Sequence, residues 1–300
     1  MDDTILNFNL PVDTLNIIKS IGVGGGGGNA VTNMYKEGIH DVSFVLCNTD
    51  NQALRKSDVP NKLLIGVNTT GGLGAGNRPE RGESAALESE EDIRSMLNDG
   101  TKMAFITAGM GGGTGTGAAP IVAKISRDMG ILTVGIVTIP YVFEGRSKLV
   151  KALKGVRRMA ENVDSLVVVN NQDLLGLEEL SVPQANRKAD ETLTIAARSI
   201  AEIITTDLEQ NVDFADVDTT MRNSGVALVS VGLGEGEGRL HLAIEQALQN
   251  TLATDKDKIY NAQRVAFVIY YSHENELKVS EMGDIDNFMD KFNTEYEVKW

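Results

Sequence analysis

Two glycine-rich runs constrain this chain more than any other feature: GVGGGGGNA at residues 22–30 and GMGGGTGTGAAP at residues 109–120. Each follows a short apolar run rich in β-branched residues and precedes a segment with helical periodicity, which predicts a strand, a loop and a helix. Glycines let backbone N–H groups approach an anion, and a helix N-terminus adds partial positive charge. A tight turn needs only one or two glycines. Five among residues 111–117 therefore predict a phosphate-binding loop.

The order of apolar runs predicts an α/β fold. Strands are expected at residues 17–23, 42–47, 103–108, 132–139 and 165–169, joined by helical crossovers into a parallel sheet. Ligands of such sheets bind outside the carboxyl ends of the strands, so the loops that follow these strands should form one site. Residues 185–209 contain no Gly or Pro and repeat apolar residues at helical spacing, which predicts one long helix.

The last third of the chain predicts a smaller α+β unit. We expect a loop at residues 211–216, a strand at 226–232, a helix at 239–251, a strand at 264–271, a helical stretch and a short strand at 296–300. The expected division is a Rossmann-like nucleotide-binding domain at residues 1–184, a central connecting helix at 185–210 and a second domain at 211–300.

Composition excludes several classes of function. A net charge of −14 disfavours nucleic acid and anionic membranes as partners. The single cysteine, Cys47, cannot form an internal disulfide. A signal peptide begins with basic residues, and this chain has none before Lys19. The longest apolar run, at 131–143, is too short to span a bilayer. His40, His241 and His273 lack neighbouring ligands at metal-binding spacing. These features predict a cytoplasmic protein without a metal site of its own.

The first glycine run alone also fits a dinucleotide fingerprint, GxGxxG, so an NAD-dependent oxidoreductase is an alternative. Two features count against it. A second, denser phosphate loop follows downstream, and the second strand closes with CNTD at residues 47–50 rather than directly with an acidic residue. The Walker pattern GxxxxGK[ST] is absent as well.

The GGGTGTG run resembles the signature loop of the tubulin/FtsZ superfamily of GTPases. Further runs resemble other loops of that family in the same order: FVLCNTDNQAL at 44–54, GGLGAGNRPERG at 71–82, FEG at 143–145 and NVDFADV at 211–217. The resemblance covers residues 16 to about 270. It implies a GTPase that converts GTP to GDP and phosphate, with Mg²⁺ held mainly by the nucleotide phosphates.

In cellular terms the resemblance points to the bacterial cell-division branch of the family. It implies head-to-tail self-assembly into filaments of the division ring, at the cytoplasmic mid-cell site. Division-ring partners are expected for the family, but the tail that binds them, and a final strand of the second domain, are missing from this sequence.

Carried over position by position, the resemblance assigns Glu144 to the ribose, and Asn171 with Asp190 to the guanine edge. An acceptor-only carboxylate rewards guanine, which presents N1–H and N2–H donors, over adenine. The alternative for Asp190 is an acid that stabilises a helix N-terminus. The full set of expected GTP contacts is Gly24, Gly25, Gly26, Gly27, Gly28, Asn29, Gly111, Gly112, Gly113, Thr114, Gly115, Thr116, Glu144, Lys148, Asn171 and Asp190.

The catalytic residues implied by the resemblance are Asn211, Asp213 and Asp216, which would place the attacking water. Asp190 and Asp213 lie at opposite ends of the expected long helix, roughly 35 Å apart at about 1.5 Å per residue. They cannot serve one site within one chain, so the loop of one subunit is expected to face the nucleotide of the next. Ordinary capping of the following helix is the alternative for the two aspartates.

Three positions depart from the family pattern. Lys148 stands where an arginine is usual, which loses bidentate phosphate geometry. Asn186 replaces a phenylalanine that stacks on guanine, and Arg78 lies where small residues are more common. These departures leave open a polymerising scaffold that binds GTP and hydrolyses little of it.

Overall fold

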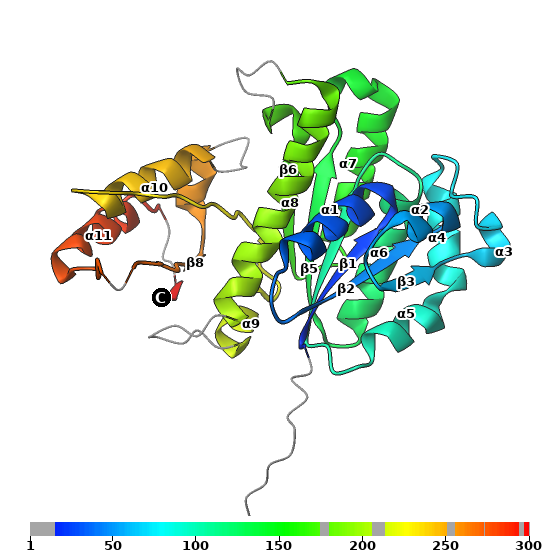
Figure 1. Cartoon of the computed structure of the whole chain (residues 1–300), viewed down its shortest axis with the longest axis horizontal. Coiled ribbons are helices and arrows are strands. Elements are labelled where there is room, and N and C mark those ends of the chain that lie inside the picture. Colours follow the sequence, from blue (N-terminus) through cyan, green and yellow to red (C-terminus); the bar gives the residue numbers. More distant parts are fainter. Residues whose placement is uncertain are drawn as a thin grey trace, which may run out of the picture.

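The central feature of the structure is a parallel sheet, which confirms the expected α/β fold (Figure 1). The structure is a computed structural model, and it describes residues 16–174, 180–205, 214–250, 256–272, 274–293 and 297–299. The strand order is β3-β2-β1-β4-β5-β6-β7, and every pair is parallel. The strands are β1 (Ile18–Val23), β2 (Val42–Asn48), β3 (Asn61–Leu64), β4 (Met103–Gly109), β5 (Leu132–Ile139), β6 (Ser165–Asn170) and β7 (Gly225–Val226).

Helices cover both faces of the sheet because successive strand residues point to opposite sides. In β2, Phe44 and Leu46 belong to one core cluster, whereas Val45 and Cys47 belong to the other. The first face is covered by α1 (Gly24–Glu37), α8 (Val182–Thr205) and α9 (Phe214–Met221). The second is covered by α4 (Pro79–Glu88), α5 (Glu90–Leu97), α6 (Thr114–Asp128) and α7 (Arg146–Ala160). The short helices α2 (Asn51–Lys56) and α3 (Val67–Thr70) complete this part.

The two cores are mainly apolar, but two charged side chains, Lys19 and Asp164, are buried at the sheet. The side chain of Lys19 in β1 is 3% exposed, and its ammonium group donates to the Asp99 carboxylate at 2.6 Å and to the Met96 carbonyl. A buried ammonium needs such partners to offset desolvation. On the same face, burial raises the pKa of the Cys47 thiol to about 12, so this cysteine is an unreactive core residue.

A second, smaller unit follows α9 and lies beside α8 (Figure 1). It contains α10 (Arg239–Asn250), β8 (Arg264–Ala266), α11 (Gly283–Met289) and β9 (Glu297–Lys299), with 3-10 turns at Lys256–Asn261 and Val279–Glu281. Strands β8 and β9 pair in parallel. Its core is formed by Leu240, Ile285, Phe288 and Met289.

The five strands predicted for the large sheet are confirmed to within a residue or two, and residues 185–205 of the predicted long helix are helical. The predictions for the last third were less accurate. Of the strand expected at 226–232 only Val226 is in a strand, the two-residue β7, which pairs with β6 of the large sheet. The strand expected at 264–271 ends at Ala266. The expected loop at 211–216 is wrong in its last part, because α9 begins at Phe214.

Strand length in this region follows from the available partners. β7 pairs only with Ser165 and Leu166 at the start of β6, and β8 has only the three residues of β9 beside it in the described part of the chain. An apolar alternation without a neighbouring strand leaves its backbone groups unpaired. The alternation at 226–232 and 264–271 therefore predicts more strand than the structure contains.

Candidate nucleotide site

The two glycine-rich loops meet where the strand order reverses. Strands β1 and β4 are neighbours, with Val23 opposite Ala108, and the loops that follow them begin α1 and α6. This reversal is the position at which open parallel sheets bind ligands. Gly24 has a φ of +73°, and a Cβ added there would lie 2.7 Å from the Gly115 amide nitrogen. The two loops are therefore in direct backbone contact.

The glycines of these loops fall into two groups. Some are required by packing: a Cβ on Gly27 would lie 2.0 Å from the Thr107 carbonyl oxygen, and one on Gly115 would lie 2.7 Å from that of Gly109. Others face open space, since an added Cβ meets nothing within 4 Å at Gly25, Gly28 and Gly112. Packing inside the chain does not require glycine at the second group of positions. Glycine there is explained if a ligand lies against the backbone where a side chain would otherwise be.

The helix N-termini at these loops carry free hydrogen-bonding capacity. Neither Val23 before α1 nor Gly113 before α6 makes a side-chain capping bond, and the first turns of both helices contain no acidic residue. The first amide groups of a helix have no partner within it and favour an anion. Two such N-termini at one sheet edge make a site suited to phosphates.

Both threonines of the second loop are hydrogen-bonded within the protein. The Thr116 hydroxyl oxygen accepts the Gly111 amide at 2.8 Å, and the Thr114 hydroxyl lies 2.7 Å from that of Thr49. These bonds fix the course of residues 111–116. The predicted role of both hydroxyls as phosphate donors stays a prediction.

Glu144 and Lys148 lie against the second loop. Glu144 ends a 3-10 turn (Val142–Glu144), where one carboxylate oxygen accepts the Tyr141 amide at 2.9 Å and the other is ion-paired with Lys148. A Cβ on Gly111 would lie 2.8 Å from Cγ of Lys148, so the lysine stem touches the loop. Lys148 therefore lies at the phosphate loop, and Glu144 is joined to it by the ion pair. The role of Glu144 at the ribose stays a prediction.

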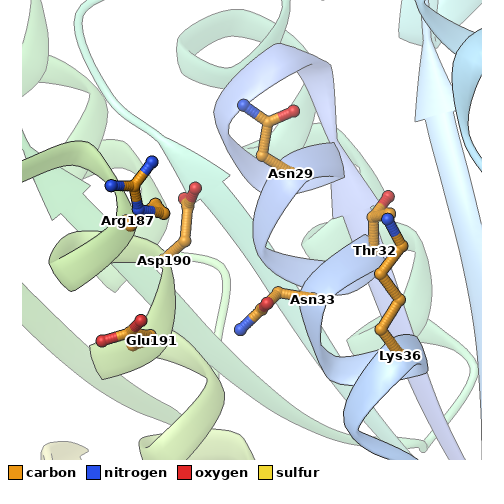
Figure 2. Close-up of a pocket in the computed structure, with 7 residues that line it drawn as sticks. All are labelled: Asn29, Thr32, Asn33, Lys36, Arg187, Asp190 and Glu191. Carbon is orange, nitrogen blue, oxygen red and sulfur yellow. The ribbon is translucent and has the colours of Figure 1, made fainter. Parts of the chain in front are cut away.

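A cleft of about 190 Å³ between α1 and α8 lies next to the first loop (Figure 2). Asp190 and Arg187 of α8 lie on one side and Asn29 of α1 on the other (Figure 2). The remaining lining residues are Thr32, Asn33, Lys36 and Glu191. Two predicted site residues, Asn29 and Asp190, therefore face each other across one opening.

Burial, and then the neighbouring Glu191, raise the pKa of the Asp190 carboxyl to about 6. Desolvation disfavours the charged form of a carboxyl group, so the shift reports a partly enclosed acceptor. A strongly shifted acid in a cleft is a candidate binding group. The alternative reading as a simple helix-start acid is weaker, because Asp190 lies eight residues inside α8.

Asn171 and Tyr141 lie near this end of the site. Asn171 follows β6 and is buried, and its Oδ1 accepts no hydrogen bond from the residues that the structure describes. Such orphaned acceptors are rare in folded proteins and favour an external donor. Tyr141 donates its hydroxyl to the Ala185 carbonyl at 2.7 Å. Burial, and then the Glu144 and Asp190 carboxylates, raise the pKa of Tyr141.

Sequence reasoning missed Tyr141 and Arg187 as site residues. Tyr141 closes the apolar run at 131–143, where an aromatic residue indicates only a buried position. The sequence contains one indication that Tyr141 belongs to the site: it lies three residues before Glu144. Arg187 lies in α8 next to Asn186, within a polar helix surface that gives no separate signal.

The predicted catalytic residues are only partly described. Asn211 and Asp213 lie outside the described residues. Asp216 lies in the first turn of α9, which packs at the C-terminal end of α8, whereas Asp190 lies near the start of α8 (Figure 1). The structure therefore does not bring Asp216 to the cleft of its own chain.

Other features of the described residues limit the chemistry. They contain no group of three or more His, Cys, Asp or Glu side chains that is arranged to hold a metal ion. Among their helices, none combines the length and apolar character needed to cross a membrane.

Comparison with known proteins yields one family. The pattern described as "Tubulin/FtsZ family, GTPase domain" matches residues 17–179. The cell division protein FtsZ of Porphyromonas gingivalis is 52% identical over 100% of this chain, which spans 66% of that protein's length, slightly under two thirds. The FtsZ of Aquifex aeolicus is 45% identical over 86% of this chain and 70% of its own.

A solved structure agrees with these sequence relatives. The structure titled "FtsZ dimer, empty", from M. jannaschii, superposes with a TM-score of 0.82 at 37% identity. The match covers 94% of this chain and 82% of the other. The fold described above and the order of the loops are therefore shared with a protein of known structure.

Proposed function

Because this chain belongs to the tubulin/FtsZ family, we propose that it binds GTP at the two glycine-rich loops and hydrolyses it to GDP and phosphate where subunits stack head to tail. The observation that carries the proposal is the pair of loops in backbone contact at the reversal of strand order. Their open glycines, Gly25, Gly28 and Gly112, leave room for a ligand beside two uncapped helix N-termini.

The guanine base lies in the cleft between α1 and α8 in this proposal. Asp190 accepts the N1–H and N2–H donors of guanine, and the unpaired Oδ1 of Asn171 adds an acceptor. Glu144 binds the ribose, and Lys148 reaches the phosphates beside Gly111. ATP is discriminated against because adenine leaves the Asp190 carboxylate without donors.

Hydrolysis is completed by the neighbouring subunit in this proposal. Asn211, Asp213 and Asp216 place the attacking water, while the loop amides bear the developing phosphate charge. The position of Asp216 at the far end of α8 from Asp190 supports catalysis between chains. A contact of this kind does not close, so it propagates as a filament. The M. jannaschii relative, titled a dimer, supports self-association.

Mg²⁺ is held mainly by the nucleotide phosphates in this proposal. The nearby acid Asp50 is already engaged, because its carboxylate accepts the Gln52 and Ala53 amides at 2.9 and 3.2 Å as the N-cap of α2.

The cellular role follows from the relatives. Both sequence relatives named above are cell division proteins, and we infer that this chain forms filaments of the division ring in the cytoplasm at mid-cell. Other division proteins are its expected partners. The scaffold alternative with little hydrolysis has one observation in its favour: the Lys148 ammonium is ion-paired with Glu144 and is a single-point contact for phosphate.

The proposal predicts that GTP turnover per subunit rises steeply above a threshold protein concentration. The measurement is phosphate release across a wide concentration range with Mg²⁺, with ATP in parallel. A rate per subunit that does not depend on concentration would mean that the active site is complete in one chain. Tight GTP binding without turnover at any concentration would favour the scaffold alternative.

A second prediction concerns Asp190, whose raised pKa has consequences for binding. The carboxylate must be charged to accept both guanine donors, so GTP affinity is expected to fall as the pH drops through about 6. Asp190→Asn is expected to weaken GTP binding by about 10–100-fold, the cost of hydrogen bonds to a charged group. Xanthine has a carbonyl in place of the guanine amino group, so this variant should gain affinity for XTP.

Asp190→Asn weakens GTP binding but is expected to make the folded protein more stable. An acid whose folded pKa exceeds its unfolded value disfavours folding above that unfolded value, and fully so above about 6. Removing the charge is expected to raise Tm at pH 7.5, with an upper bound of about 3 kcal/mol before solvent screening. Calorimetry and nucleotide titration across pH 5–8 check both effects; weakened GTP binding together with a lowered Tm would contradict this account.

A further inference from the structure

The segment that carries Asp216 is fastened to the rest of the chain at its far end. Helix α9 begins at Phe214 and ends at Met221, and the chain then enters β7 at the edge of the large sheet. Asn223, between them, has a φ of +52°, the left-handed conformation common after a helix end. The Gly225 amide donates to the Asp164 carbonyl at 3.1 Å, and the Ala227 amide donates to that of Leu166 at 2.9 Å.

A buried carboxylate lies at this junction. The side chain of Asp164, just before β6, is 2% exposed, and its Oδ2 accepts the Thr133 amide at 3.0 Å. Two guanidinium groups face it: Nε of Arg127 lies 3.6 Å from Oδ1, and Nη1 of Arg222 lies 3.9 Å from Oδ2. A buried carboxylate is tolerated only with such compensation.

Arg222 connects this carboxylate to α9. Its Nε and Nη2 donate to the Asp218 carboxylate at 3.0 and 2.5 Å, within the last turns of α9. One guanidinium thus lies between an acid of α9 and an acid of the large sheet. A planar guanidinium with five donors in a fixed fork suits this bridging position, which a lysine would fill with a single point charge.

Two further arginines hold the end of α9. Arg127, near the end of α6, donates to Oδ1 of Asn223 at 2.6 Å. Arg264 of β8 donates from Nη1 to the carbonyls of Thr220 at 3.2 Å and Arg222 at 3.1 Å. The last carbonyls of a helix lack partners within it and favour a cation. The C-terminal end of α9 is therefore held from the large sheet and from the smaller unit together.

The short length of α9 makes this fastening important for its other end. Eight residues span about 12 Å, so a 10° rotation at the fastened end would move the first turn by on the order of 2 Å. Misplacement of a catalytic group by about 1 Å can cost about 100-fold in rate. Asp216 lies in that first turn.

We propose that Arg127, Asp164, Arg222 and Asn223 form a positioning cluster that holds α9, with Asp216 in its first turn, in the orientation that completes the neighbouring subunit's active site. The proposal rests on hydrolysis between subunits as proposed above. These four residues lie away from the nucleotide cleft of their own chain, so they act on turnover through α9. GTP binding and the amount of polymer are independent of them.

The test uses Arg222→Met in the full chain, with three quantities measured separately: the Kd for GTP, the critical concentration for assembly and the turnover per assembled subunit. Turnover is expected to fall at least about 10-fold, with Kd and critical concentration within about twofold of the parent. Arg222→Lys should restore part of the lost turnover. Arg157→Met is the matched control, because Arg157 is a surface arginine, 86% exposed, outside the cluster, and it should change nothing.

A second variant covers the case in which Arg222→Met does not fold. Asn223→Gly removes the acceptor of Arg127 but keeps the left-handed backbone accessible, since glycine adopts positive φ freely. It should lower turnover in the same selective way, by a smaller factor. An unchanged turnover in both folded variants would overturn the positioning role.

A mixing experiment separates positioning from a general structural defect. Arg222→Met subunits mixed with subunits that cannot bind GTP but keep an intact α9 should regain turnover, because the intact α9 then faces a functional nucleotide. Mixing with Asp213→Ala subunits should not restore it. Loss of GTP binding by Arg222→Met, or no restoration in the first mixture, would contradict the proposal. If the parent chain itself shows no concentration-dependent turnover, it is the proposed function that fails.

Discussion

Asp213→Ala is expected to lower GTP turnover by about 100–1,000-fold, the usual cost of losing a group that stabilises or positions the reacting species, while the Kd for GTP stays unchanged. Asp216→Ala should behave in the same way. Asp216 lies in the first turn of α9, at the far end of α8 from the cleft that contains Asp190, and Asp213 comes three residues before it in the sequence. A carboxylate that acts only on the neighbour's nucleotide cannot affect binding in its own cleft.

The measurement is phosphate release above the threshold concentration, with nucleotide binding measured on dilute protein. The matched control is Asp218→Ala, which removes a carboxylate two residues further along α9. It removes one acceptor of the Arg222 guanidinium, so a partial loss of turnover is expected, well short of that for Asp213→Ala. A parallel loss of GTP binding in the Asp213 or Asp216 variants would contradict catalysis between chains.

Mixing two inactive variants tests catalysis between chains by a gain of turnover. When Asp213→Ala subunits are mixed one to one with subunits unable to bind GTP, about a quarter of the head-to-tail contacts pair an intact α9 with an intact nucleotide site. Turnover should therefore reappear in a mixture of two proteins that are each inactive. A mixture that stays inactive while it assembles would exclude the two-chain site.

The double variant Gly25→Ala/Gly112→Ala is expected to lose about 100–1,000-fold in GTP affinity while it keeps a parent-like Tm. An added Cβ meets no protein atom within 4 Å at either position, so folding is little affected. Each methyl group, however, would occupy the side on which phosphate oxygens approach the backbone amides. Losing one charge-assisted hydrogen bond in each loop, at about 1.5–2 kcal/mol apiece, costs about 3–4 kcal/mol in total, which corresponds to the stated loss of affinity.

The neighbouring glycines supply the matched controls. Gly27→Ala and Gly115→Ala add the same methyl group against the carbonyl oxygens of Thr107 and Gly109, at 2.0 and 2.7 Å. Both should lower the free energy of unfolding by about 3 kcal/mol through overpacking. Thermal unfolding and GTP titration of all the variants check the distinction. If alanine at Gly25 and Gly112 lowered Tm as much as alanine at Gly27 and Gly115, the division of the glycines into open and packed positions would be wrong.

The sequence was sufficient for β1, β2, β4, β5 and β6 because these strands are buried along nearly their whole length and are rich in apolar residues. It was insufficient where strands are short or exposed. β3 consists of Asn61, Lys62, Leu63 and Leu64, of which the first two are exposed, so it carries no apolar signal. β7 has only two residues. The overestimated strands at 226–232 and 264–271 had the right alternation, and a pattern in one segment contains no information on whether a partner strand lies beside it.

The candidate site was predictable in part for a similar reason. Phosphate loops are contiguous runs with a chemical reason for each glycine, so residues 24–28 and 111–116 could be assigned, and the family resemblance added Asp190 and Asn171. The cluster around Asp164 was not predictable. Its members come from α6, the start of β6, and the segment after α9, and only the folded chain brings them together.

The order of strands also has a consequence for how the chain folds. β1 lies in the interior of the sheet, where Ile18 pairs with Val42 on one side and with the distant Met103 of the central strand β4 on the other. The long segment between Ile18 and Met103 must be brought together before the contacts of β1 with β4 can stabilise the pairing, and this makes the pairing slow. The two halves of the phosphate site lie on the two strands of this late pairing, as the contact between Gly24 and Gly115 indicates. An emerging chain therefore lacks the proposed GTP site until the second glycine loop has been synthesised and packed against the first. The time at which GTP binding appears during refolding would report when β1 pairs with β4.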